Sequence, residues 1–195
     1  GVPNPRPGTR NGAREVRHWA LEVNMVHYHT RVCPYDMCNV IDYGDMEFLN
    51  NPYQLMSNLE EIAELYREFQ KRGIAPLSIG GEHTCTYGIL KGLGCEEPLA
   101  VVHLDAHGDT SVGFAGSPVS DASLFQNAAV EGFINPEKMV QVGQRGRGVI
   151  RCDFSTNSGM RRIFADEAQQ KGMAYVVSEI KKIIGDAPCY LTIDT

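Results

Sequence analysis

The stretch LAVVHLDAHGD at residues 99–109 decides the fold class of this 195-residue chain. Its first part, Leu99–Leu104, is a continuous apolar run, which is typical of a strand buried on both faces. Strands of this kind alternate along the chain with helical patterns, so the sequence predicts a mainly parallel sheet covered on both sides, a three-layer α/β/α fold. The other expected strands are 39–43, 74–79, 139–142, 162–165 and 189–193.

Helices are expected wherever apolar residues recur at three- and four-residue spacing. The clearest pattern is Leu55–Lys71, in which Leu59, Ile62 and Phe69 fall on one face and Gly73 follows as a stop signal. The remaining helices are expected at 13–25, 84–93, 123–130 and 175–184.

Composition and charge exclude several classes of protein. The chain has 43% hydrophobic residues and a net charge of -6, which fits one globular domain over residues 1–195. Its basic residues are scattered, so neither a nucleic acid nor an anionic membrane is expected as a partner. No apolar run approaches the roughly 18 residues that span a bilayer, and residues 1–17 do not resemble a secretory signal, so a cytoplasmic protein is expected. The six cysteines contain no C-x-x-C pair, which argues against a disulfide scaffold or a thiolate zinc site.

Acidic and imidazole side chains follow three of the expected strands. They are His83, Asp105, His107, Asp109 and Asp194. Because the carboxyl ends of parallel strands lie at one edge of the sheet, we expect these five side chains to converge there. In the segment D-A-H-x-D the alternate residues point the same way, so one site can receive all three polar side chains.

The most economical interpretation of this cluster is a pair of divalent cations. Two carboxylates buried side by side without a cation cost several kcal/mol each. Oxygen ligands outnumber nitrogen ligands, which favours manganese over zinc. His83 taken alone would be interpreted as a structural residue. His103, inside the strand, is expected to be packed or to contact a ligand, and His18, His27 and His29 are expected at the surface.

Several segments resemble the ureohydrolase (arginase and agmatinase) family, in its agmatinase-like branch. GGEHT at 80–84, HLDAHGD at 103–109 and TIDT at 192–195 are similar to its GG[DE]H[ST], H-x-D-A-H-x-D and [ST]-x-D-x-D motifs. RPGTRNGAREVR at 6–17 and EGFINPEKMVQVGQRG at 131–146 extend the resemblance over nearly the whole chain. The chain stops one residue before the second Asp of the last motif, so the resemblance implies one ureohydrolase domain over 1–195 that lacks its C-terminal part.

The resemblance also implies a ligand set and a reaction. One metal ion would be held by His83, Asp105, Asp109 and Asp194. The other would be held by Asp105, His107 and Asp194, so that two aspartates bridge. Asp109 would be catalytic, taking the proton of the attacking water and passing it to the leaving amine. The implied enzyme is a metal-dependent amidinohydrolase that contains two Mn2+ ions, cleaves a guanidino compound to urea and an amine, and forms a homo-oligomer such as a trimer or hexamer.

The expected substrate loop departs from the family. Agmatinase-like members carry H-G-x-x-[FM] after the D-A-H-x-D motif, whereas this chain has DASLF at 121–125, with Asp121 at the place of the His. Asp121 pairs with a cationic group of the substrate, belongs to a neighbouring structural hydrogen bond, or caps the helix that follows it. Agmatine or a guanidino acid is the expected substrate, and a small compound such as free guanidine is the alternative.

Two rival functions remain open. A metal-dependent deacetylase would share the α/β/α fold, but it needs an adjacent His-His pair, which this sequence lacks. A catalytically inactive family member acting as a structural or regulatory subunit is compatible with Asp121 and with the truncated last motif. Metal content separates the second rival from the enzyme.

Overall fold

A parallel sheet forms the centre of the molecule. The computed structural model describes residues 8–47, 54–112, 117–146 and 153–194. Within them the strands are β1 (Leu99–Leu104), β2 (Ile134–Gln144), β3 (Arg161–Phe164) and β4 (Cys189–Ile193), arranged in the order β3-β2-β1-β4. Every pair is parallel, as the alternation of strands and helices predicts.

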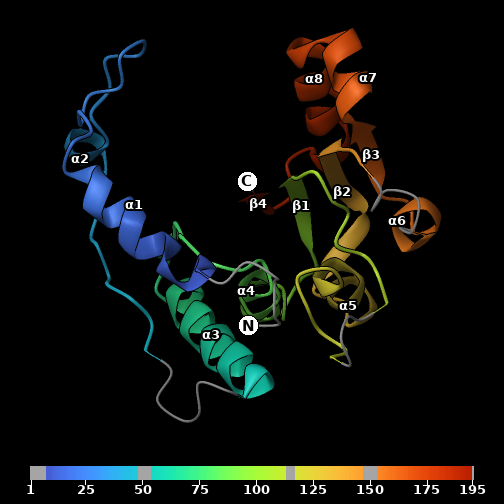
Figure 1. The fold of residues 1–195 in the computed structure, drawn as a ribbon, viewed down its shortest axis with the longest axis horizontal. Helices are drawn as coiled ribbons and strands as arrows, with labels where there is room; N and C mark the ends of the chain where they lie inside the picture. The colour runs from blue at the N-terminus through green and yellow to red at the C-terminus, as the bar shows by residue number, and fades with distance from the viewer. Residues whose placement is uncertain (1–7, 48–53, 113–116, 147–152, 195) are drawn as a thin grey trace.

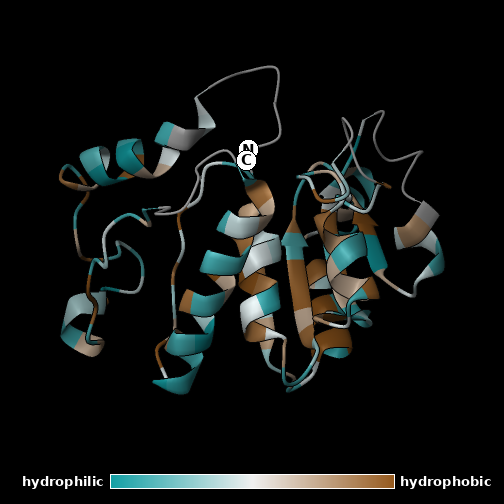
Figure 2. Ribbon diagram, turned by 90° about the horizontal axis from the view of Figure 1, so that it is seen from below, coloured by the Kyte–Doolittle hydropathy of each residue, from teal (hydrophilic) through white to brown (hydrophobic). Residues whose placement is uncertain are grey.

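Helices cover both faces of this sheet (Figure 1). On one face α4 (Cys85–Leu93) and α5 (Leu124–Val130) form an apolar cluster with Val101 and Met139, and α3 (Leu55–Lys71) packs against α4. On the other face α7 (Ala165–Lys171) and α8 (Met173–Ile184) cover Val102, Val140 and Ile163. Figure 2 shows the strands largely in the hydrophobic colour, and the two apolar clusters lie on opposite faces because successive strand residues alternate in direction. The three-layer α/β/α fold is therefore confirmed.

Glycines bring α3 and α4 into close contact. Gly88 and Gly92 are one turn apart on α4. A Cβ atom added at Gly88 would lie 2.8 Å from the carbonyl oxygen of Leu59, and one at Gly92 would lie 2.6 Å from that of Ala63. Since these neighbours are backbone atoms, only glycine permits this separation of the helices. The contact fixes the start of α4, which lies just after His83.

Two expected strands are absent, and these predictions are wrong. Residues 74–79 and 39–43 join no sheet in the part of the chain that the structure describes. In the first of them Ile74, Leu77 and Ile79 are exposed, and Leu77 has 94% of its surface in solvent. An apolar run becomes a strand only when a neighbouring strand accepts its backbone hydrogen bonds, and the described residues provide none here. The segment is instead held to α3 by a hydrogen bond between Tyr66 and Ser78.

The helix expected at 13–25 is shorter in the structure, which has α1 over Gly12–Ala20, after a 3-10 turn at Thr9–Asn11. Asn24 accepts a hydrogen bond from the backbone N–H of Val26, a local turn that competes with helical bonding. Three further short helices were not expected, namely α2 (Pro34–Met37), α6 (Asp153–Asn157) and α7. Neither α1 nor α2 contains a buried residue.

No helix among the described residues is both long and apolar enough to cross a bilayer. The predicted surface positions of His18, His27 and His29 are confirmed, because all three are exposed. The cysteines at 33, 38, 85, 95 and 189 are free, and Cys152 lies outside the described residues.

Candidate metal centre

The expected site residues come from three segments that meet at the carboxyl edge of the sheet. His83 lies in the turn before α4, and Asp105 and Asp194 directly follow β1 and β4. These two strands are paired up to their last residues, Leu104 and Ile193. The backbone N–H of Asp194 donates to the carbonyl oxygen of Leu104 at 2.9 Å, so the pairing brings the two aspartates to the same edge.

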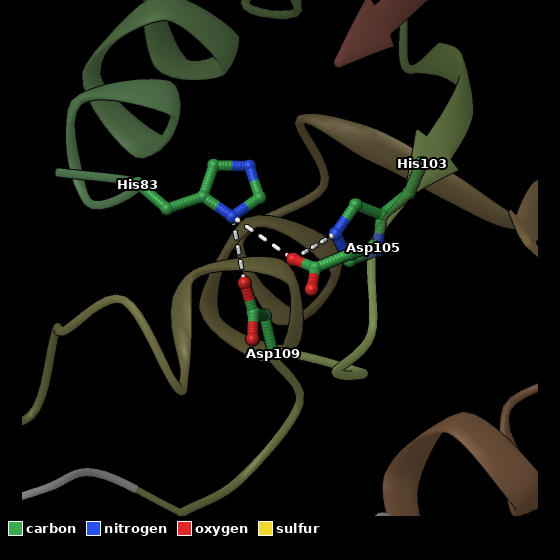
Figure 3. A group of neighbouring side chains, drawn as sticks. All are labelled: His83, His103, Asp105 and Asp109. Carbon is green, nitrogen blue, oxygen red and sulfur yellow. Dashed lines mark hydrogen bonds and ion pairs between the residues drawn. The ribbon is translucent and has the colours of Figure 1, made fainter. Parts of the chain in front are cut away.

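Three carboxylates surround one nitrogen of His83. The distances from Nδ1 are 2.7 Å to Asp109 Oδ2, 3.4 Å to Asp194 Oδ2 and 3.6 Å to Asp105 Oδ2. Figure 3 shows His83, Asp105 and Asp109 pointing toward one another, with His103 behind Asp105. The potential ligand atoms of these four labelled residues lie within 4.8 Å of one another.

The backbone at Asp109 places its carboxylate in the cluster. Asp109 has a φ of 51°, in the left-handed region that residues other than glycine rarely adopt. This conformation costs on the order of 1–3 kcal/mol. It is held by a hydrogen bond from the backbone N–H of Phe125 to the carbonyl oxygen of Asp109. The turn directs the carboxylate back toward His83, and the residue is only 8% exposed.

The second nitrogen of His83 also has a partner. Nε2 lies 3.0 Å from the hydroxyl oxygen of Thr192, two residues before Asp194 on β4. A proton on Nε2 would be donated to that hydroxyl, which leaves Nδ1 free to bind a cation. Thr192 was not expected from the sequence. The available signal was its position, since residues 192 and 194 of a strand point to the same side.

The electrostatics of the cluster favour a cation. Burial by itself lowers the pKa of His83, but the hydrogen bond to Asp109 and the three nearby carboxylates outweigh burial, and the pKa lies above its ordinary value. Burial raises the pKa of Asp194, and the negative charges of Asp105 and Asp109 raise it further. Burial would also raise the pKa of Asp105, yet hydrogen bonds from His103 and the backbone of His107 hold it below its usual range. A donor set of carboxylates and imidazole in this state fits a divalent cation.

His107 lies at the rim of the cluster. Its side chain is 66% exposed, and its Nδ1 lies 3.2 Å from Asp105 Oδ1. Its backbone N–H donates to the same oxygen at 2.7 Å. The structure therefore brings four of the five predicted ligands together and places the fifth on their solvent side.

Asp121 lies close to the turn that carries His83. Burial raises the pKa of Glu82, and the charge of Asp121 raises it further. The capping interpretation of Asp121 is wrong, because Ser123 occupies the N-cap position of α5. Asp121 Oδ1 instead accepts a hydrogen bond from the backbone of Ala122 at 2.8 Å.

Comparison with known proteins decides the family. A sequence model described as the Arginase family matches residues 2–195. The chain belongs to the arginase family. This family is the one expected from the motifs at 80–84, 103–109 and 192–195.

Arginase-family relatives match over almost the whole chain. A guanidinopropionase from Pseudomonas aeruginosa is 36% identical over 97% of this chain, which covers 60% of that protein. A solved structure of proclavaminate amidinohydrolase from Streptomyces clavuligerus has a TM-score of 0.86 at 29% identity, over 97% of this chain and 63% of that one. A hypothetical agmatinase from Burkholderia thailandensis gives a TM-score of 0.84 at 30% identity, over 95% of this chain and 57% of that one. This chain spans about 60% of the length of the curated relatives that it matches.

Proposed function

We propose that the full-length protein uses two divalent metal ions to hydrolyse a linear guanidino compound to urea and an amine. The observation that carries this proposal is the convergence of three carboxylates on Nδ1 of His83, at 2.7 Å, 3.4 Å and 3.6 Å. Carboxylates so close together in a largely buried site repel one another unless a cation neutralises them. The names of the relatives, which include guanidinopropionase, guanidinobutyrase and agmatinase, support the reaction class.

The proposed ligands divide into two sets that share two aspartates. The first ion would be held by His83, Asp105, Asp109 and Asp194. The second would be held by Asp105, His107 and Asp194. His107 suits the second ion because its Nδ1 approaches Asp105 Oδ1, whereas His83 and His103 approach Oδ2. The excess of oxygen ligands favours Mn2+, with Ni2+ as the alternative.

The residues of this chain would orient the reactants and move one proton. When bound, the two cations supply Lewis acidity that lowers the pKa of a shared water. Asp109 is the proposed general base and acid, because its Oδ2 already accepts a hydrogen bond at 2.7 Å and its left-handed backbone fixes its direction. It would accept a proton from the attacking water and return it to the leaving amine. Asp105 is held at both oxygens, by His103 and by the His107 backbone, so it keeps a constant orientation.

Asp121 is the proposed contact for the cationic end of the substrate. Its carboxylate and that of Glu82 place two acids near the turn that carries His83. An acidic pair favours a guanidinium or amino group over a carboxylate. Agmatine and guanidino acids such as guanidinobutyrate remain the leading substrates, and free guanidine is the alternative. Asp121→Asn should lower kcat/KM for agmatine more than for guanidinobutyrate, and an unchanged ratio would contradict this role.

The proposed function is tested by metal content and urea release in the full-length protein. We expect close to two ions per chain after loading with Mn2+ or Ni2+. We also expect urea from at least one of agmatine, guanidinobutyrate, guanidinopropionate, arginine and guanidine. A full-length protein that binds no metal would refute the proposal. One that binds two ions and releases no urea from any of the five would support an inactive subunit instead.

The cytoplasmic location and the homo-oligomeric state stay predictions. Light scattering of the full-length protein after size-exclusion chromatography measures the oligomeric state directly. A trimer or hexamer is expected, and a monomer would contradict it.

A further inference from the structure

A row of polar residues crosses the sheet directly beneath the candidate metal centre. His103 on β1 is in register with Gln141 on β2 and with Thr192 on β4. His103 and Gln141 are 0% exposed and Thr192 is 7% exposed. Polar groups at such positions are destabilising unless they are hydrogen-bonded, so their partners carry information about their role.

Hydrogen bonds connect this row to Arg162 on one side and to Asp105 on the other. Arg162 Nε lies 2.6 Å from Gln144 Oε1, and Gln144 Nε2 lies 2.7 Å from Gln141 Oε1. Gln141 Nε2 lies 3.3 Å from His103 Nδ1 and 2.6 Å from the carbonyl oxygen of Gly108. His103 Nε2 then lies 2.9 Å from Asp105 Oδ2.

The chemistry of Arg162 sets one direction for the whole chain of bonds. A guanidinium only donates, so Gln144 must present its carbonyl oxygen to Arg162 and its NH2 group to Gln141. Gln141 must then accept with Oε1 and turn its own NH2 group toward His103 Nδ1. A carbonyl oxygen also only accepts, so Gly108 requires the same orientation of Gln141.

This orientation determines the tautomer of His103. Its Nδ1 receives a donor and carries no proton, so its Nε2 carries the proton and donates it to Asp105. The ring also contacts Phe125, with the ring centroids 4.6 Å apart. Hydrogen bonds and packing therefore fix both the protonation and the direction of the imidazole.

A bulge in β2 makes the arrangement possible. Residues three apart on a regular strand point to opposite faces, so Gln141 and Gln144 would not meet. The pairing of β2 with β3 is irregular between Val142 and Gln144, and Gly143 between them has a φ of 99°. A bulge of this kind inserts one residue and turns the following side chain. Gln144 is thereby brought to the same side as Gln141.

We propose that His103 is a positioning residue, whose Nε2 proton holds the Asp105 carboxylate in the geometry that binds metal. The direction of this hydrogen bond is set from Arg162 through Gln144 and Gln141. With one oxygen held by His103 and the other by the His107 backbone, the lone pairs of Asp105 that remain face the cluster. Partners of this kind set the orientation of a metal ligand and its affinity. The inference rests on the proposed function in that Asp105 is taken as a ligand.

The sharpest test changes Gln144, which is not a proposed ligand, so that the direction of hydrogen-bond donation along the chain of bonds is reversed. Gln144→Glu provides a carboxylate, which can still pair with Arg162 but cannot donate to Gln141. Gln141 would then turn its NH2 group toward the new carboxylate and its oxygen toward His103, at the cost of its hydrogen bond to Gly108, because the charged carboxylate repels Gln141 Oε1 more strongly than the neutral Gly108 carbonyl does. The imidazole must respond by losing the donor to Asp105 or by becoming positively charged beside the metal ions. Either response should weaken Mn2+ binding to the metal-free full-length protein, measured by calorimetry, by roughly 10- to 100-fold.

Three further variants separate positioning from general loss of structure. His103→Leu removes the donor and should weaken Mn2+ binding in the same range, whereas His103→Gln retains a donor and should bind close to wild type. Gln170→Glu makes the same charge change at an exposed position of α7 and should leave affinity unchanged. Thermal unfolding of each metal-free variant reports its fold.

The outcomes distinguish the inference from the function on which it rests. Wild-type affinity in Gln144→Glu would overturn the proposed relay from Arg162, and wild-type affinity in His103→Leu would overturn the positioning role of His103. A His103→Gln variant that folds and binds as weakly as His103→Leu would also overturn it. Failure of the wild-type protein to bind Mn2+ would instead refute the proposed function.

Discussion

Replacing Thr192 by valine should weaken metal binding without unfolding the protein. Thr192 Oγ1 lies 3.0 Å from His83 Nε2, and the side chain of His83 is only 7% exposed. Valine has nearly the same shape as threonine, so the packing of β4 is retained while the hydroxyl is lost. When Nδ1 binds a cation, the imidazole proton must sit on Nε2, where the variant offers it no acceptor.

The expected size of the effect follows from this unpaired donor. A buried donor without a partner costs about 1–3 kcal/mol. Above the pKa of His83 the metal-free protein escapes part of this penalty, because the single proton of the neutral imidazole can lie on Nδ1, facing Asp109 at 2.7 Å. The penalty therefore falls mainly on the metal-bound state. The dissociation constant for Mn2+ should rise by roughly 5- to 150-fold.

Calorimetric titration of the metal-free full-length protein measures this change, and two variants control for it. Thr192→Ser keeps the hydroxyl and should bind close to wild type. Tyr87→Phe removes a hydroxyl from a buried side chain whose partner is Glu131 at 2.7 Å, at the C-cap of α5, and should not change affinity. If Thr192→Val bound Mn2+ as tightly as wild type, the assignment of Nδ1 as the ligand atom of His83 would be wrong.

Three further predictions concern the metal centre and the fold. Asp105→Ala should abolish urea release and reduce bound metal below two ions per chain by elemental analysis, with the thermal melt of the metal-free protein largely retained. The pKa of His83 is raised in the metal-free protein, so the stability it contributes is complete below its unfolded pKa of about 6.5 and is lost as pH rises through the folded pKa. Thermal melts in chelator should therefore show that the stabilisation by His83 decreases between about pH 5.5 and 8. His83→Ala should remove this part of the pH dependence of stability. A variant whose stability changed with pH as steeply as that of the wild type would contradict the prediction. Gly92→Ala should destabilise the fold by about 1–3 kcal/mol in denaturant titrations, because its Cβ would lie 2.6 Å from the Ala63 carbonyl oxygen. A Gly80→Ala control, whose Cβ would meet nothing within 4 Å, should change little.

The core of the fold could be predicted because it follows from local patterns. Leu99–Leu104 is apolar except for His103, and the structure buries it between the two helical layers. Leu55–Lys71 has one apolar face, and its helix begins and ends where the pattern does. α7 was missed because Ala165–Lys171 has no apolar periodicity. Glu167 of α7 instead forms an ion pair with Arg161 of β3 at 2.6 Å, and a contact of this kind cannot be predicted from hydrophobic periodicity.

The segment 74–79 marks the limit of this kind of prediction. Its apolar residues resemble those of a buried strand, yet Ile74 and Ile79 are about half exposed, at 47% and 50%. A strand is a property of two segments, since each supplies the hydrogen-bonding partner of the other. The described residues provide no such neighbour, so the local pattern was correct about hydrophobicity and wrong about structure.

Some residues of the candidate metal centre could be predicted from local sequence, whereas others depend on the register of the strands. His83, Asp105, Asp109 and Asp194 could be predicted because each follows a strand or occupies a short motif. The residues beneath them could not, because their partners depend on which positions of β1, β2 and β4 face one another. His103 lies two residues before the proposed metal ligand Asp105, and Gln141, the polar residue in register with His103 on the neighbouring strand, supplies a donor to its Nδ1. A non-donating residue at that position would leave the tautomer of His103 unspecified, so the choice of residue 141 belongs to the metal centre although it touches no metal ligand.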